Sequence, residues 1–436
     1  KALSAHAQQA LKKQFPNLKV GAGISEVTPL WLLNAVRVVG KKSAVEKLVT
    51  WSVRDQFDLE TRKAVSEFDE YASSTEANEK EIAWGVEHIR APELWAIGVK
   101  GEGVNVTLID SGVTVRHPDL KSAIHKNRGE MGTDQEGREK QTNGVDDDGN
   151  GHIDDVEGWN FETNNNNVED FHGHGTQAAG IVVGRGTNGT RTGVAPEAKL
   201  IVVRACCSTD SQVAESNLWL GIQYALVRNS RVISMSLSVR HYADPSYAKW
   251  RRIGEVLLAS GVIHVNAAGN RGQSNVPYNV GAPGANPPAW FHSSQVRGAP
   301  SSMITVGATD DGDHPRSYSS SGPVTWESIP EYQDFPIDHG NKPGLIRPDV
   351  CAPSEVPTTN ADGMSYSPHF GGTSASTPHV AGLVALLLSA NPELTAAQVT
   401  EALQETAVTV EQGFNNRCGA GRVDAARAYD YARKRF

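Results

Sequence analysis

Short apolar runs alternate with segments of helical spacing from residue 84 onwards. Runs rich in Val, Ile and Leu predict strands, and segments whose apolar residues recur every three or four positions predict helices. The predicted strands are residues 104–109, 200–206, 232–237 and 262–267, and the predicted helices are residues 175–183, 216–227, 253–259 and 395–406, with a further long helix that begins near Ser374. Strands that are apolar on both faces and alternate with helices are typical of a mostly parallel sheet with helices on both faces. We therefore predict a doubly wound α/β fold.

Residues 1–65 depart from this pattern and predict a small, separate α/β unit. The two predicted helices of this unit are residues 4–14 and 43–51. Its two predicted strands are residues 30–39 and 53–59. Residues 67–80 are rich in Ser, Glu, Asp, Asn and Lys and show little periodicity, which predicts a linker between the two units.

Composition indicates a globular protein and excludes several classes of function. The chain has 436 residues, of which 39% are hydrophobic and 21% charged, and its formal net charge is −9. Because no block of Lys and Arg stands out, we expect neither nucleic acid nor a membrane surface as a partner. The longest near-apolar run, residues 380–390, is too short to span a bilayer. No secretory signal peptide opens the chain. Either a signal peptide was removed or none existed, and the sequence does not distinguish the two.

The chain has four cysteines, and none of them forms a CxxC pattern, so a thiolate metal site is not expected. Cys206 and Cys207 are adjacent, and adjacent cysteines do not readily bond to each other. A bridge from either one to Cys351 or Cys418 is the alternative to four buried free thiols. The free thiols are the favoured prediction, because unpaired cysteines are among the most buried residues.

Three short motifs carry an Asp, a His and a Ser at positions suited to catalysis. Asp110 follows a predicted strand, and the carboxyl end of a parallel strand is where such folds bind ligands. His174 lies between two glycines in Gly-His-Gly-Thr, and Ser374 lies at the start of a predicted helix, where N–H groups would stabilise an oxyanion. Alone, each has an ordinary structural explanation, as a turn residue, a structural histidine or a helix cap. Together, in the order Asp, His, Ser, they predict a catalytic triad.

At these motifs the chain resembles the subtilisin family of serine peptidases, from about residue 84 to residue 436. The resemblance implies that Asp110 orients His174, that His174 is the general base and acid, and that Ser374 is the acyl-forming nucleophile. Asn270 matches the family's oxyanion-hole asparagine, which acts with the backbone N–H of Ser374. The implied activity is that of an endopeptidase that acts on polypeptides.

The resemblance also implies two walls for the pocket that holds the substrate side chain before the cleaved bond. One wall pairs with substrate backbone by strand addition, and the other faces it. The walls are Ser236, Leu237 and Ser238 on one side and Ala267, Ala268 and Gly269 on the other. Ser238 replaces the usual Gly and adds bulk at the pocket rim. Ala375 replaces the usual Met after the nucleophile, which predicts tolerance to peroxide.

Residues 20–65 resemble the subtilisin propeptide, a ferredoxin-like α/β unit that assists folding and inhibits its own enzyme. The resemblance divides the chain into a propeptide of residues 1–71, a linker and processing region of residues 72–83, and a catalytic domain of residues 84–436. It implies a zymogen that cuts itself, for which we expect a site near Tyr71-Ala72. We expect a secreted monomer, extracellular or periplasmic.

Residues 143–155 are dense in oxygen ligands and predict a structural Ca²⁺ site. Asp146, Asp148 and Asn150 have the spacing of a calcium-binding loop, and clustered carboxylates would repel one another without a cation. The predicted ligands are Asp146, Asp148, Asn150, His152, Asp154 and Asp155, and by family resemblance Asp119 would ligate a second calcium. A solvated acidic loop is the alternative.

An active enzyme is favoured over a catalytically silent binding scaffold on the same fold. All four chemical residues are present, and a chain released from catalysis has no physical reason to keep them. A sedolisin-type acid peptidase is excluded by His174, because those enzymes place a carboxylate in the position of the base. Since the imidazole must be neutral to act as a base, we expect activity to rise through neutral pH.

Overall fold

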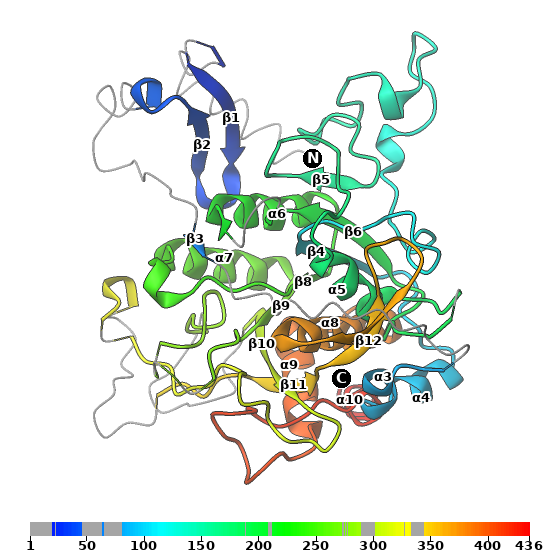
Figure 1. Cartoon of the computed structure of the whole chain (residues 1–436), viewed down its shortest axis with the longest axis vertical. Helices are drawn as coiled ribbons and strands as arrows, with labels where there is room; N and C mark the ends of the chain where they lie inside the picture. Colours follow the sequence, from blue (N-terminus) through cyan, green and yellow to red (C-terminus); the bar gives the residue numbers. More distant parts are fainter. Residues whose placement is uncertain are drawn as a thin grey trace.

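A seven-stranded parallel sheet forms the centre of the protein in a computed structural model (Figure 1). The structure describes residues 20–21, 23–45, 63–64, 81–187, 189–207, 212–272, 274, 276, 278–288, 301–326, 328–332 and 344–436. The strand order is β11-β10-β9-β8-β4-β6-β5, and every neighbouring pair is parallel. The strands are β4 (Asn105–Asp110), β5 (Gly158–Asn160), β6 (Lys199–Arg204), β8 (Val232–Met235), β9 (Ile263–Ala267), β10 (Met303–Thr309) and β11 (Val350–Pro353).

Helices cover both faces of this sheet, which confirms the predicted fold class. The side chains of Leu200 and Val202 on β6 join one buried cluster with α5 and α8, whereas those of Ile201 and Val203 join a second cluster with α6 and α7. Alternate residues of a strand point to opposite faces, so continuous apolar strands bury both faces. The helices are α3 (Trp84–His88), α4 (Ala91–Ala96), α5 (His174–Val183), α6 (Glu215–Val227), α7 (Tyr247–Ser260), α8 (Gly372–Ala390), α9 (Ala396–Thr406) and α10 (Ala425–Arg435).

Helix α8 is the one helix among the described residues that is long and apolar enough to cross a membrane. Of that apolar stretch, 89% is buried inside the protein. Its leucines and valines pack in the cluster that also contains α5 and alternate residues of the sheet. The apolar character of α8 is therefore explained by its place in the core, and its first turn lies at the edge of the sheet.

The N-terminal unit contains an antiparallel hairpin, β1 (Ile24–Leu30) and β2 (Ala35–Gly40), joined by a 3-10 turn at Trp31–Leu33. The sequence predicted one strand at residues 30–39, and this prediction is wrong. Asn34 takes a left-handed conformation with φ of 52° and donates its N–H to Trp31 O, so the chain reverses there. Residues 42–45 are helical and overlap the predicted helix at residues 43–51 over its first three residues. The other predicted elements of this unit, and the linker at residues 67–80, lie outside the described residues.

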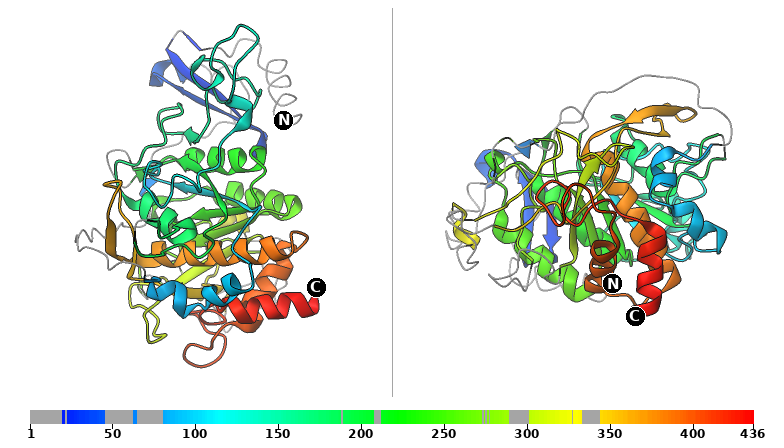
Figure 2. Two further views of the ribbon diagram at one scale, coloured as in Figure 1. Left: turned by 90° about the vertical axis from the view of Figure 1, so that its right-hand side faces the viewer. Right: turned by 90° about the horizontal axis from the view of Figure 1, so that it is seen from below.

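The hairpin lies on α6 and α7 (Figure 2). Leu30 and Leu32 are buried in the same cluster as the apolar faces of these helices. Gln223 of α6 donates to Pro29 O at 3.0 Å and accepts from the N–H of Leu32 at 3.2 Å. A second contact follows further along, where β3 (Lys63–Ala64) pairs antiparallel with β7 (Gln212–Val213), the strand just before α6.

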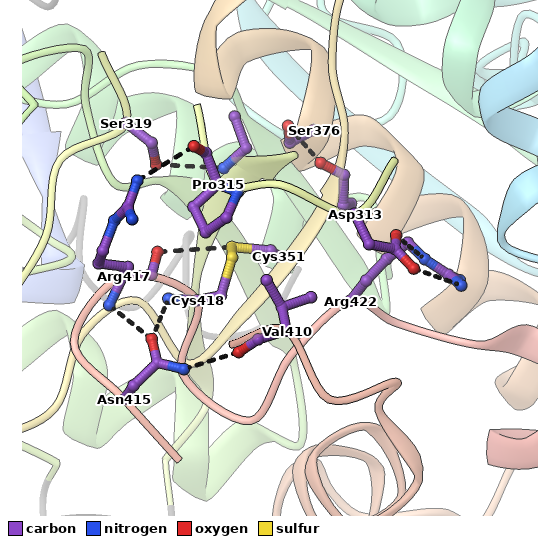
Figure 3. The surroundings of a disulfide bond; sticks show 12 residues. Asp313, Pro315, Ser319, Cys351, Ser376, Val410, Asn415, Arg417, Cys418 and Arg422 are labelled. Carbon is purple, nitrogen blue, oxygen red and sulfur yellow. Dashed lines mark hydrogen bonds and ion pairs between the residues drawn. A yellow bond between two sulfur atoms is a disulfide. The ribbon is translucent and has the colours of Figure 1, made fainter. Parts of the chain in front are cut away.

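All four cysteines are paired, which corrects the prediction of free thiols. Cys351 on β11 bonds to Cys418, and their Cα atoms are 5.1 Å apart (Figure 3). The loop around Cys418 lies along β11, since Cys351 donates its N–H to Gly421 O and accepts at its carbonyl from Val423. Cys206 bonds to Cys207, although neighbouring cysteines were not expected to pair. The first pairing depends on a contact between residues 67 positions apart, which sequence spacing does not reveal.

We expect the Cys351→Ala/Cys418→Ala double variant to lower the free energy of unfolding by about 4 kcal/mol, because the bond closes a long loop in the unfolded chain. Urea unfolding, followed by circular dichroism, measures this difference. The matched control is Cys206→Ala/Cys207→Ala, whose bond joins neighbours and closes no loop. Equal losses in the two variants would contradict the loop-closure account.

Candidate active site

Asp110 and His174 meet where the end of β4 faces the start of α5. Asp110 is the last residue of β4, and His174 is the first residue of α5. His174 Nδ1 lies 2.7 Å from Asp110 Oδ1, and the two side chains are only 4% and 0% exposed. This approach requires Gly175, because a Cβ there would lie 2.1 Å from Gly112 O. The predicted Asp–His pair is thus a buried hydrogen bond made at close backbone contact.

Ser374 lies in the first turn of α8, which begins at Gly372. Its hydroxyl donates to Ser236 O at 3.2 Å, and Ser236 Oγ donates to Ser374 O at 2.9 Å. The imidazole of His174 packs edge-on against Phe370, four residues before Ser374, with ring centroids 5.2 Å apart. Helices α5 and α8 also pack against each other. The structure therefore brings the three predicted catalytic residues to one edge of the sheet.

Asn270 lies against the same turn of α8. Its Oδ1 accepts from the N–H and from the hydroxyl of Thr373, each at 2.9 Å. Its Nδ2 lies toward Gly372, where an added Cβ would be 2.7 Å away. Gly372 has φ of 73°, a conformation that glycine adopts without strain. These contacts place an amide group directly beside the backbone of Ser374.

The two predicted pocket walls both lie next to this turn. Ser236, Leu237 and Ser238 directly follow β8, and Ala267 ends β9 with Ala268 and Gly269 after it. The N–H of Gly269 donates to Thr373 Oγ1 at 3.2 Å, so the second wall contacts α8. Ser238, which replaces the family's Gly, is buried, and its Cβ would lie only 2.7 Å from a Cβ added at Gly281. Its bulk is therefore accommodated by a glycine opposite.

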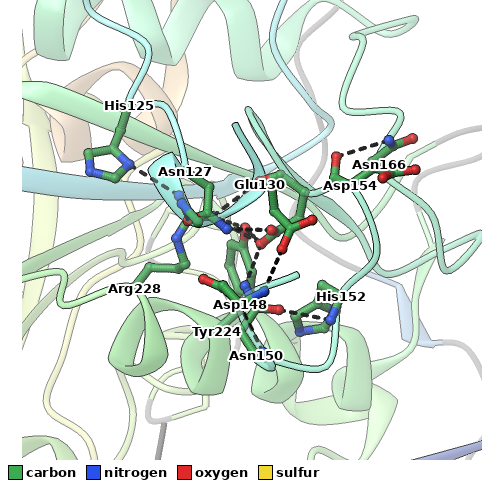
Figure 4. Close-up of polar contacts among 12 residues, drawn as sticks. His125, Asn127, Glu130, Asp148, Asn150, His152, Asp154, Asn166, Tyr224 and Arg228 are labelled. Atoms are coloured by element: carbon green, nitrogen blue, oxygen red, sulfur yellow. Dashed lines mark hydrogen bonds and ion pairs between the residues drawn. The ribbon is translucent and has the colours of Figure 1, made fainter. Parts of the chain in front are cut away.

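Three carboxylates gather at the acidic loop, with oxygen atoms within 4.8 Å of one another. They belong to Asp146, Asp148 and Glu130, which ends the 3-10 turn Arg128–Glu130. Glu130 and Asp148 are labelled in Figure 4. Glu130 is fully buried, and its Oε2 has no hydrogen-bond partner among the residues that the structure describes. Burial, and then the nearby aspartates, raises the pKa of Glu130 to about 7. A set of oxygen donors with surplus negative charge, one of them buried and two half-buried, suits a hard divalent cation.

Glu130 was not among the predicted ligands, because no local motif marks it and it lies well before the acidic segment. Of the predicted ligands, the structure brings Asp146 and Asp148 into this cluster. Asn150 lies beside them: its N–H donates to Asp146 Oδ1 at 3.1 Å and to Asp148 Oδ1 at 3.0 Å. Its own Oδ1 accepts from the N–H of His152.

The other predicted ligands do not lie in the cluster. His152 packs its ring against Trp159, Phe161 and Tyr224, and burial lowers its pKa to about 3. Asp154 accepts from the N–H of Gly144. Asp119 is buried elsewhere, where its Oδ2 accepts from Tyr366 OH at 2.7 Å and from Gly186 N–H at 3.0 Å. The predictions for His152, Asp154 and Asp155 therefore receive no support from this arrangement, and the prediction that Asp119 ligates a second calcium stays a prediction.

Asp155 forms a buried ion pair that anchors the acidic loop to α6. Its Oδ2 lies 3.1 Å from Arg228 Nη1 and accepts from Tyr224 OH at 2.5 Å, and its Oδ1 accepts from Asn127 Nδ2 at 2.5 Å. Both charged side chains are nearly inaccessible, at 4% exposure for Arg228 and 0% for Asp155. Removing one partner would leave the other charge buried and unpaired.

We expect Arg228→Met to lower the free energy of unfolding by about 3–5 kcal/mol, since Asp155 would lose its buried cation. Asp155→Asn/Arg228→Met should recover part of this loss. The control is Arg252→Met, because Arg252 is 62% exposed in its pair with Glu255 and should change stability by less than about 0.5 kcal/mol. Urea unfolding compares the four proteins, and a loss in Arg228→Met no larger than in the control would contradict the expectation.

Comparison with known proteins identifies the family of this chain. The sequence model of the subtilase family matches residues 101–421. Subtilisin E of Bacillus subtilis is 29% identical over 360 residues, which cover 82% of this chain and 72% of the relative. Thermitase of Thermoactinomyces vulgaris is 28% identical over 356 residues, 80% of this chain and 96% of the relative. The major intracellular serine protease of Bacillus subtilis is 27% identical over 314 residues, which cover 72% of this chain and 77% of the relative. Because the family match spans most of the chain, including the segments around Asp110, His174 and Ser374, the chain belongs to the subtilase family.

Proposed function

We propose that this protein is a serine endopeptidase in which Asp110, His174 and Ser374 form the catalytic triad. The observation that carries the proposal is the buried 2.7 Å contact between Asp110 Oδ1 and His174 Nδ1, made beside the first turn of α8. Membership of the subtilase family and the similarity to proteins named as subtilisins and serine proteases support peptide bonds as the target.

The role of Asp110 follows from which imidazole nitrogen it holds. A carboxylate that accepts from Nδ1–H fixes the tautomer in which Nε2 carries the lone pair. Nε2 would then take the proton of Ser374 while Oγ attacks the substrate carbonyl carbon. The same proton would pass to the leaving amine, and water would release the acyl group by the reverse sequence. The hydroxyl of Ser374 would exchange its present hydrogen bond to Ser236 O for one to His174.

The oxyanion of the tetrahedral intermediate would be held by the start of α8 and by Asn270. The N–H of Ser374 lies in the first helical turn, where the helix dipole favours negative charge. The Oδ1 of Asn270 accepts from Thr373, and because the other polar group of the amide, Nδ2, is a donor, it is the group that would donate to the oxyanion. Two fixed donors stabilise the transition state more than the substrate.

Polypeptide substrates would bind as an added strand between the two walls. The segments that follow β8 and β9 both lie beside α8. An extended peptide between them would therefore present its scissile bond to Ser374. Such main-chain pairing is independent of side-chain identity, which supports an endopeptidase. The alternative, a catalytically silent scaffold on the same fold, would bind polypeptides without reacting with a fluorophosphonate reagent.

The N-terminal unit would act as a propeptide. The hairpin covers α6 and α7, and β3 adds a strand to β7 as an extended substrate would. We propose that the protein is a self-processing zymogen with the division at residues 1–71, 72–83 and 84–436, and with its cut near Tyr71-Ala72, outside the described residues. Two disulfides support an oxidising location outside the cytoplasm.

A structural Ca²⁺ would be held by Glu130, Asp146 and Asp148. The donors are all oxygens, and a divalent cation would neutralise repulsion among three close carboxylates. The ion would link the turn at Arg128–Glu130 to the acidic segment, and Asp155 links that segment to α6. Its contribution would be to stabilise the folded state, since a ligand that binds only this state raises stability.

We expect the purified full chain to divide near residues 72–80 and its larger fragment to gain one phosphonate from a fluorophosphonate reagent. Ser374→Ala should stay undivided and unlabelled, because it lacks the nucleophile. Ser376→Ala is the matched control: Ser376 lies on the same helix, but its hydroxyl donates to Ala352 O. Intact mass spectrometry reads both events, and a divided but unlabelled fragment would favour the silent scaffold.

We expect Ca²⁺ at a hundred times its Kd to raise the free energy of unfolding of Ser374→Ala by about 2.7 kcal/mol. The Ser374→Ala background prevents self-digestion during the measurement. Adding Glu130→Gln should remove most of the gain, whereas adding Glu136→Gln should not, because Glu136 is 73% exposed nearby and lies outside the cluster. Thermal unfolding with Ca²⁺ and with a chelator measures the gain, and equal gains in both variants would refute Glu130 as a ligand.

A further inference from the structure

The helix that presents His174 begins without a capping side chain of its own. Its N-cap residue is Gly173, with φ of 103°, and no side chain there accepts from the first turn. The first N–H groups of a helix have no partners within the helix, and buried ones must be satisfied from elsewhere. Since His174, Gly175 and Thr176 are all buried, the residues that supply these acceptors fix the position of His174.

One buried carboxylate, that of Asp170, accepts from the first turn of α5 and from the segment just before it. Its Oδ1 accepts from the backbone N–H groups of His172 at 3.0 Å and Gly173 at 2.8 Å. Its Oδ2 accepts from the N–H of Thr176 at 2.9 Å and from its hydroxyl at 2.6 Å. Asp170 is only 5% exposed. The carboxylate therefore holds the backbone on both sides of His174.

Ser111 joins this carboxylate to the Asp110–His174 pair. Its hydroxyl donates to Asp170 Oδ1 and accepts from the N–H of Gly175, each at 2.9 Å. Its own N–H donates to Asp110 Oδ1 at 2.7 Å, and the same oxygen contacts His174 Nδ1. Through this one residue, the geometry around Asp170 and the geometry of the Asp–His hydrogen bond depend on each other.

We propose that Asp170 is a positioning residue for catalysis: its four hydrogen bonds to the segments before and after His174, together with the one from Ser111, hold the imidazole where Nε2 reaches Ser374. The proposal rests on the proposed function and deepens it. Asp170 touches neither substrate nor the reacting atoms, so it acts only through His174 and Ser111.

A carboxylate is required because all five groups that converge on Asp170 donate. A carboxylate accepts at both oxygens, whereas an asparagine of nearly equal size would point an NH₂ donor at some of these donors. Asp170→Asn would therefore keep the volume of the side chain while breaking the hydrogen bonds at one oxygen. Ser111→Ala is a milder change that removes only the link between Asp170 and Gly175.

The test compares the full chain with Asp170→Asn and Ser111→Ala on a peptide amide substrate. We expect Asp170→Asn to lower kcat roughly 10- to 100-fold, the effect of a small misplacement of a catalytic group, and to leave KM within about threefold. In the proton NMR spectrum, the downfield resonance of the Nδ1–H shared by Asp110 and His174 should shift or broaden. A residue that only stabilised the fold would change neither kcat nor this resonance in the folded protein.

The matched control is Asp424→Asn. Asp424 is also a buried helix cap, only 2% exposed, and it accepts from the N–H of Arg427 at the start of α10. The Asp424→Asn variant should have a lower free energy of unfolding than the unaltered protein and the same kcat. An equal fall of kcat in this control would overturn the proposal, because the effect would then follow stability.

Wild-type kcat with an unchanged resonance in Asp170→Asn would also overturn the proposal. If Asp170→Asn does not fold, Ser111→Ala decides: a lowered kcat supports the proposal, and wild-type kcat overturns it. If the unaltered protein has no peptidase activity, the proposed function fails by itself. The resonance of Asp170→Asn against that of the unaltered protein then still tests whether Asp170 holds the Asp110–His174 geometry.

Discussion

The close backbone contact between the start of α5 and the end of β4 is the constraint on which the candidate site depends. A Cβ at Gly175 would lie 2.1 Å from Gly112 O and 3.1 Å from the Cβ of Asp110, so only glycine allows the approach. At any larger separation, the carboxylate at the strand end would not reach the imidazole at the helix start. The buried charge of Asp110 is tolerated there because it accepts from both Ser111 N–H and His174.

A second close contact brings α8 to the same place. Gly372 lies against Asn270, and Thr373 bonds to Asn270 and to the chain after β9. Because β4, β8 and β9 are parallel, their carboxyl ends lie on one edge, and the three loops that follow converge there. The long apolar body of α8 anchors this arrangement, since it is buried along almost its whole length.

Helix α6 connects the parts of the molecule that lie outside the site. On one turn it contacts the N-terminal hairpin through Gln223 and the acidic loop through Tyr224. Arg228, one turn further along, completes the buried ion pair with Asp155. Both attached segments lie at the same end of the molecule in Figure 2, and α6 follows directly on β7, the strand that β3 extends. The N-terminal unit and the acidic loop are thus held by the same rigid element.

The sequence by itself determined the elements and motifs that local chemistry encodes. Apolar strands, helical periodicity and the glycine-flanked motifs around Asp110, His174 and Ser374 are readable because each depends on residues a few positions apart. The prediction of one strand at residues 30–39 failed because a left-handed Asn34 reverses the chain within an apolar run. Only the tertiary structure decided which groups surround Glu130, Asp155 and Asp170 and that Cys351 pairs with Cys418. Except for the contacts of Asp170 with residues 172–176, these depend on partners more distant in sequence. A buried polar group takes the partner that the fold places beside it, so residue spacing alone does not identify that partner.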